Sequence, residues 1–291
     1  MSLLAPNPAR RAVERYWLGY TAVWGGAAAA VMLSGVAERW SDAELVPFGV
    51  GLGLGAVVPP VVRPHPSERA RRWRERTAFK AGLSVIGFAF LWNYFCTPYF
   101  FEVLHMHYGF RTALNLRQNP VFLYPLTVAY FATYFVLVSV ADRLAQRARA
   151  PAARRVLGLC APFAVAFLET ALNANPFMRR LFCYDEPGFM LWFGTLSYGL
   201  CFVCARPVWC GIDARPLGPV VRREGQASSP AGFAATSLRA VVVGVLAATM
   251  VVVIALELLR HLVAPAFTVV RAGAPGLRDY GASCLGPVPT E

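Results

Sequence analysis

The chain has 291 residues, of which 57% are hydrophobic and only 15% are charged, and it carries a net charge of +12. Soluble domains have roughly a quarter of charged residues, so this composition excludes an ordinary soluble enzyme. The basic residues are confined to short segments between apolar stretches. We therefore expect no nucleic-acid partner.

Seven apolar stretches are long enough to cross a bilayer, because about 18 residues or more match a hydrocarbon core of roughly 30 Å. They cover residues 16–37, 45–62, 81–101, 121–141, 156–174, 188–205 and 240–259. Pro59 and Pro60 shorten the second stretch, and the cysteine-rich 201–204 shortens the sixth. The sequence predicts an all-α polytopic membrane bundle of about seven transmembrane helices. Residues 1–291 form one membrane domain, with a flexible loop at 211–232.

Lys and Arg cluster before the first stretch and in every second connection after it. Of the 28 basic residues, 20 fall on one side of the predicted membrane and 8 on the other. This is the positive-inside pattern, so the amino terminus and the loop 211–232 are expected in the cytoplasm and the carboxyl terminus opposite. The clusters are expected to orient the helices and to contact anionic lipid head groups.

Glu169 lies inside the fifth stretch, where a carboxylate is costly unless it is paired, protonated or facing a polar cavity. Other polar side chains are expected near the same, non-cytoplasmic ends of the helices. These are Asn93, Tyr94, Tyr99, Glu102, His105, His107, Asn173, Asn175, Tyr184, Asp185, Glu186 and Glu257. Their convergence in an apolar bundle predicts a pocket of lipid size in one leaflet.

Other chemistries are not favoured. Cys201 and Cys204 have no second pair nearby, and no metal site is expected. Cys183 and Cys284 fall on the same predicted side of the membrane, and whether they pair is left open. The glycines of 51–55 lack the strand and turn of a dinucleotide fingerprint, so close helix packing explains them better.

Three segments carry a resemblance to a known family. They are Leu-Ala-Pro-Asn-Pro at 4–8 with Arg10-Arg11, Asn-Tyr-Phe at 93–95 with Thr97 and Tyr-Phe-Phe at 99–101, and Phe-Leu-Glu-Thr at 167–170 with Ala-Asn-Pro-Phe at 174–177. Shorter matches follow in order at 119–120, 207, 212–213 and 284–285. Together these segments resemble the cycloeucalenol cycloisomerases, the cyclopropyl sterol isomerases of plant-type sterol synthesis.

The resemblance implies an isomerase (intramolecular lyase) that opens the 9,19-cyclopropane ring of a sterol such as cycloeucalenol. An acid protonates carbon 19, a positive charge forms near carbon 9, and a base removes the proton from carbon 8 to leave the 8-ene. This reaction requires no redox cofactor, and none is expected. The partners would be the cyclopropyl sterol and membrane lipid, in the endoplasmic reticulum of a eukaryote or the inner membrane of a bacterium.

Glu169 is the first candidate for the acid. Burial disfavours the charged form of a carboxyl group, so an acid in a hydrocarbon-lined pocket keeps its proton at neutral pH. The family motif matches at the same position and extends to Thr170 and Asn175, which we expect at the substrate. Asn173 lies four residues from Glu169 on the same helical face, where its amide can orient the carboxyl group.

The other substrate-binding candidates lie in the third stretch. Asn93, Tyr94 and Tyr99 match the family segment and are candidates for a proton relay or for binding the sterol hydroxyl. Trp92, Tyr94 and Phe100 offer ring faces that stabilise a cation. Packing at the membrane interface is the alternative reading for any one of these aromatic residues.

The second catalytic role stays open in the sequence. Where plant members of the family carry a histidine this chain has Pro98, and it has Glu102 where they carry a basic or neutral residue. If that histidine is the base, then Glu102, His105, His107 or water takes its place here. Two other functions remain as alternatives: a sterol-binding or sterol-transport membrane protein without catalysis, and a proton-coupled transporter that titrates Glu169.

Overall fold

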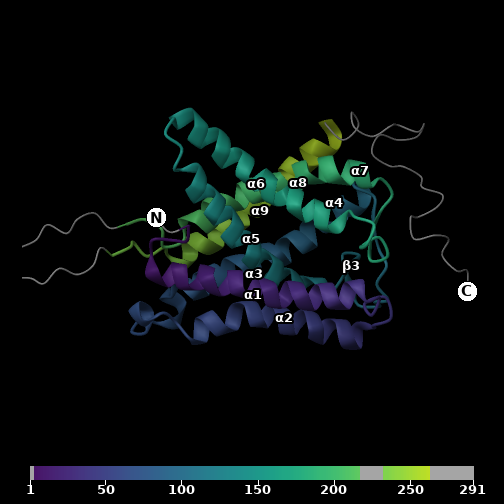
Figure 1. The fold of residues 1–291 in the computed structure, drawn as a ribbon, viewed down its shortest axis with the longest axis horizontal. Helices are drawn as coiled ribbons and strands as arrows, with labels where there is room; N and C mark the ends of the chain where they lie inside the picture. Colours follow the sequence, from purple (N-terminus) through teal and green to yellow (C-terminus); the bar gives the residue numbers. More distant parts are fainter. Residues whose placement is uncertain (1–2, 217–231, 263–291) are drawn as a thin grey trace, which may run out of the picture.

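The computed structural model describes residues 3–216 and 232–262, which are mostly helical (Figure 1). The long helices of this part of the chain are α1 (Pro8–Leu33), α2 (Asp42–Val62), α3 (Thr77–Phe95), α5 (Leu123–Ala145), α6 (Pro151–Asn173), α8 (Thr195–Gly211) and α9 (Leu238–Leu262). Short helices are η1 (Pro66–Glu68), η2 (Trp73–Glu75), α4 (Thr97–Glu102), α7 (Pro187–Phe189) and the π-helical turn η3 (Met190–Gly194).

Within the described residues, six helical segments are long and apolar enough to cross a membrane. They are α2, α3, α5, α6, α9 and the continuous run Pro187–Gly211 of α7, η3 and α8. The prediction of an all-α polytopic membrane bundle is confirmed. Helix α1, which contains most of the first predicted span, is as long as the others but lies outside this set, because its tyrosines and tryptophans make it less apolar. It still packs against α2, α3 and α5.

Two small antiparallel strand pairs lie between the helices. Strand β1 (Met106–Tyr108) pairs with β4 (Phe182–Tyr184), which places Met106 opposite Tyr184. Strands β2 (Asn115–Leu116) and β3 (Asn119–Pro120) form a hairpin before α5. The first pair joins segments that are more than 70 residues apart in the sequence, at the end of α4 and after α6.

Local sequence explains where the helices begin and how closely they pack. Ser41 and Glu44 form a capping box at the start of α2, which satisfies backbone N–H groups that the first helical turn leaves without partners. Along α2, Gly49 and Gly53 face the carbonyl oxygens of Phe122 and Pro125 so closely that a Cβ atom would clash. The close helix packing expected from the glycine-rich segment is therefore present between α2 and α5.

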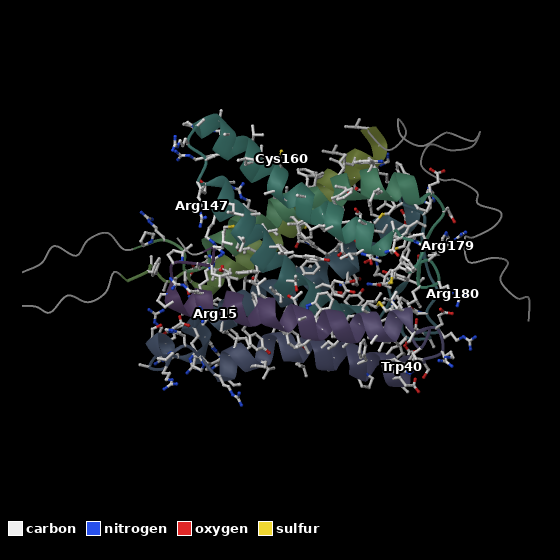
Figure 2. All side chains as sticks on the ribbon, in the orientation of Figure 1. Arg15, Trp40, Arg147, Cys160, Arg179 and Arg180 are labelled. Carbon is white, nitrogen blue, oxygen red and sulfur yellow. The ribbon has the colours of Figure 1, made fainter. Side chains whose placement is uncertain are left out.

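Helix α5 occupies the centre of the bundle, in contact with α1, α2, α3, α6 and α8. Figure 2 places Arg15 and Arg147, both from segments expected in the cytoplasm, at one end of the molecule, and Arg179 and Arg180 at the other. Helix α1 begins at the first end and α9 ends at the second (Figure 1). Which end faces the cytoplasm stays a prediction. Most of the expected flexible loop, residues 217–231, and also Cys284 lie outside the described residues.

Candidate active site

A cavity lies between α3, α4, α5, α6 and α8, and strands β1 and β4 form part of its wall. The space within it, its mouth included, is about 830 Å³. Most of the lining is aromatic or aliphatic. Trp92 of α3 packs edge-on against Phe131 of α5, with 5.3 Å between ring centroids, and Phe202 of α8 adds a third ring. Such a lining suits an apolar ligand with a few polar groups.

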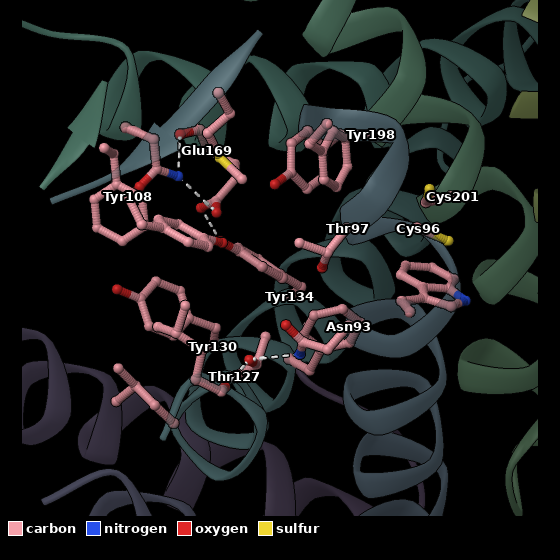
Figure 3. A pocket seen from close by; sticks show the side chains of 18 of the residues that line it. Asn93, Cys96, Thr97, Tyr108, Thr127, Tyr130, Tyr134, Glu169, Tyr198 and Cys201 are labelled. Atoms are coloured by element: carbon pink, nitrogen blue, oxygen red, sulfur yellow. Dashed lines mark hydrogen bonds between the residues drawn. The ribbon is translucent and has the colours of Figure 1, made fainter. Parts of the chain in front are cut away.

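Glu169 of α6 is the acid of this cavity, and its side chain is buried. Its Oε1 accepts a hydrogen bond of 2.8 Å from the Asn173 amide, one helical turn further along. This is the interaction that the four-residue spacing predicts. Its Oε2 is bonded to the hydroxyl of Tyr134 on α5. Figure 3 shows both bonds meeting at the carboxyl group. Both described partners are uncharged, so neither supplies a counter-charge to this buried carboxyl group.

Tyrosine hydroxyls surround this acid. Tyr130 and Tyr134 come from α5, Tyr198 comes from α8, and Tyr108 and Tyr184 come from the β1–β4 pair. Burial raises the pKa of Tyr108 and of Tyr184, and nearby ionisable groups, Glu169 among them, raise it further. Both phenols are therefore neutral at physiological pH. They are polar groups that add no charge to the cavity.

A second cluster of polar side chains lies at the cavity, away from Glu169 (Figure 3). The Asn93 amide of α3 donates to Thr127 Oγ1 at 2.8 Å, and its Oδ1 accepts a bond of 2.7 Å from Asn119. Thr97 lines the wall beside them and accepts a longer bond from Asn119. Thr127 and Tyr134 are seven residues apart on α5, or two turns, so the two polar groups are separated by about 10 Å along that helix.

The structure brings together five of the predicted site residues, since Trp92, Asn93, Phe100, Glu169 and Asn173 all line the cavity. Their catalytic and binding roles stay predictions.

The other substrate-binding candidates do not line it. Tyr94 is 37% exposed. Tyr99 of α4 is buried, and its hydroxyl lies 3.3 Å from the Ser197 hydroxyl of α8. Thr170 bonds to Thr195 on α8. Asn175 lines a neighbouring cavity that shares Phe182 and Tyr184 with the main one.

The two further catalytic candidates also lie outside the cavity lining. Glu102, at the end of α4, forms an ion pair of 2.7 Å with Arg260 of α9. His107 Nε2 of β1 lies 3.0 Å from Asp185 Oδ2. Its neighbours Met106 and Tyr108 line the cavity, and successive side chains of a strand point to opposite faces. The geometry does not favour either residue as the base.

Comparison with known proteins finds one similar over most of the chain. Over 223 residues, the chain is 27% identical to the cycloeucalenol cycloisomerase of Arabidopsis thaliana. The matched region covers 73% of this chain and 77% of that protein. The chain is similar to a cycloeucalenol cycloisomerase. The resemblance seen in the sequence motifs is thus confirmed across most of the chain. No family model and no solved structure matches it.

Several lining residues were not among the sequence candidates, notably Thr127, Tyr130 and Tyr134. They recur at three- and four-residue spacing in an apolar helix, which places them on one helical face. This spacing of polar side chains is the sequence pattern that indicates a shared face toward a cavity. Tyr108 gave no comparable signal, because it reaches the cavity only through the pairing of β1 with the distant β4.

Proposed function

We propose that this protein is an integral-membrane isomerase that opens the cyclopropane ring of a cycloeucalenol-type sterol and leaves a double bond between carbons 8 and 9. The similarity to a protein named cycloeucalenol cycloisomerase supports the reaction class. The observation that carries the proposal is Glu169, a buried acid with uncharged partners in an aromatic cavity within the helix bundle.

The reaction begins with proton donation to carbon 19, which is an unactivated carbon of a strained ring. A carboxyl group that keeps its proton at neutral pH is a suitable donor, and general acid catalysis contributes about 100- to 10,000-fold. The Asn173 amide fixes one carboxyl oxygen as an acceptor, which leaves the other oxygen to carry the proton. The acid is in this way oriented as well as protonated.

Ring opening leaves a positive charge near carbon 9. The rings of Trp92, Phe131 and Phe202 line the cavity, and an aromatic ring attracts a cation that lies over its face. The carboxylate that remains on Glu169 adds a counter-charge at the same stage. The site therefore binds the charged intermediate more tightly than the neutral sterol, as catalysis requires.

The test is incubation of the purified protein in detergent with cycloeucalenol and no added nucleotide or metal, followed by identification of the sterols. We expect the 8-ene isomer, obtusifoliol, with one solvent deuterium in its new methyl group when the reaction is run in deuterated water. Cycloeucalenol that binds but is recovered unchanged would contradict the proposal and support a sterol-binding or transport protein.

A further inference from the structure

The proposed reaction moves two protons, one onto carbon 19 and one from carbon 8, and each needs a group within the cavity. Among the described residues that line the cavity, Glu169 is the only carboxylic acid and none is a histidine. Glu102 and His107 are engaged by Arg260 and Asp185 outside the lining. Glu169 and the hydroxyl and thiol groups of the lining are therefore the described side chains in the cavity that can exchange a proton.

Tyr134 is the side chain joined to that acid. It lines the cavity from the central helix α5, it is 8% exposed, and its hydroxyl is bonded to Glu169 Oε2. Its ring packs against Phe131 and Phe202, with centroid distances of 5.9 and 4.9 Å, so its position is held from two sides. In Figure 3 the ring of Tyr134 extends from the carboxyl group of Glu169 into the cavity.

The hydrogen bonds decide where the acidic proton lies. Asn173 donates to Glu169 Oε1, so that oxygen is an acceptor and the proton of the neutral acid is on Oε2. An Oε2 proton is donated to the Tyr134 oxygen, and the hydroxyl proton of Tyr134 is then free to point into the cavity. When Glu169 is charged, the Tyr134 hydroxyl donates to Oε2, which is the direction that the structure records. The pair has one arrangement for giving a proton and one for accepting it.

We propose that Tyr134 exchanges protons with the sterol directly and that Glu169 supplies and recovers them through the Tyr134 hydroxyl. This inference rests on the proposed function. In the first step, the electron pair of the bond between carbons 9 and 19 takes the Tyr134 proton and forms the methyl group. The Tyr134 oxygen takes the Glu169 proton at the same time. The products of this step are a cation at carbon 9 and a carboxylate.

In the second step the Tyr134 oxygen accepts the proton of carbon 8 and returns its own proton to Glu169. The electron pair of that carbon–hydrogen bond forms the double bond between carbons 8 and 9 and cancels the cation. The acid is regenerated, no net proton is consumed, and no further base is needed. The mechanism accounts for a cavity whose described lining contains one carboxyl group.

The test compares Tyr134→Phe with Tyr124→Phe. Tyr124 lies on the same helix, its hydroxyl donates to Leu116 O at 2.9 Å, and its side chain does not line the cavity. We expect Tyr134→Phe to lower kcat with cycloeucalenol by about 100- to 10,000-fold with unchanged sterol binding. Tyr124→Phe should stay within a few fold of the parent protein. Turnover by Tyr134→Phe within a few fold of the parent would overturn the role of Tyr134 and leave the proposed function intact.

A second variant covers the case in which Tyr134→Phe fails to fold or to bind sterol. Tyr134→fluorotyrosine keeps the ring and hydroxyl but makes the hydroxyl more acidic, so it should change kcat and leave KM and sterol binding as they are. A structural role for the hydroxyl would leave kcat unchanged, and that result overturns the proposal. Absence of turnover by the parent protein would instead refute the isomerase function itself.

Discussion

Two regions of the bundle bury acidic side chains, and they differ in the charge of the partners. At the end where α1 begins, Glu14 is fully buried and pairs with Arg10 at 3.0 Å and with Arg143 at 2.7 Å. Beside them, Lys80 and Asp213 form a buried ion pair of 2.5 Å. In the cavity, Glu169 is also buried, with 8% of it exposed, but it is bonded to a phenol and an amide.

Burial alone therefore does not mark a reactive group. A buried acid with a cationic partner stays charged, and the attraction offsets the cost of removing both charges from water. A buried acid with neutral partners lowers its free energy by keeping its proton, which it can then donate. The first arrangement joins α1, α3, α5 and the segment after α8, while the second is suited to chemistry.

The largest effect is expected when Glu169 is given a cationic partner like those of Glu14. Asn173→Lys places an ammonium group one turn after Glu169, in the favourable order for a helical ion pair. The carboxyl group should then be charged and unable to donate, and turnover should fall by about 100- to 10,000-fold. Product analysis measures this. Asn173→Met is the control of similar length, and it should lose much less activity. Equal losses in the two variants would show that charge is not the cause.

The reverse change removes the acid from the ion-pair region. Glu14→Gln leaves the buried Arg10 and the partly exposed Arg143 without their counter-charge, which should lower the free energy of unfolding by about 3 to 5 kcal/mol. Unfolding of the protein in detergent, followed by circular dichroism, measures this effect. Glu75→Gln, at an exposed position of η2, should change stability by less than about 0.5 kcal/mol. A Glu14 variant as stable as this control would mean that the network does not hold the helices together.

The smallest effect is expected at Glu102, whose side chain is 46% exposed and paired with Arg260. Glu102→Gln removes a solvent-exposed ion pair, so stability should change by about 0 to 1 kcal/mol. Turnover should stay within a few fold, because Glu102 does not line the cavity. A loss of about 100-fold would restore Glu102 as the catalytic base.

The membrane helices and the acid were accessible from the sequence because each has a one-dimensional signal. Apolar stretches predict spans by length, and Glu169 stands out as a lone carboxyl group in such a stretch. The bond from Asn173 to Glu169 followed from helical spacing. Helix α1 shows the limit of this signal, because its aromatic residues leave it outside the six clearly apolar spans.

The rest of the site depends on which helices meet. Tyr134 stands in an apolar helix where an aromatic residue has the same sequence signature as a packing residue, and only the contact between α5 and α6 brings it to Glu169. The prediction that Tyr99 lines the substrate site was wrong for a different reason. It matched the family segment, but its hydroxyl lies against Ser197 of α8 and not in the cavity lining. The ion pair of Lys80 with Asp213 joins residues 133 positions apart, which no local pattern indicates.

The most direct test of the account is a paired measurement on Glu169→Gln, which keeps the shape of the side chain and removes its acidic proton. Cycloeucalenol binding and turnover are measured on the same preparation of purified protein. The account predicts binding close to that of the parent protein and turnover lower by about 100- to 10,000-fold. Turnover within a few fold of the parent would contradict it, because the protonated acid would then have no part in opening the ring.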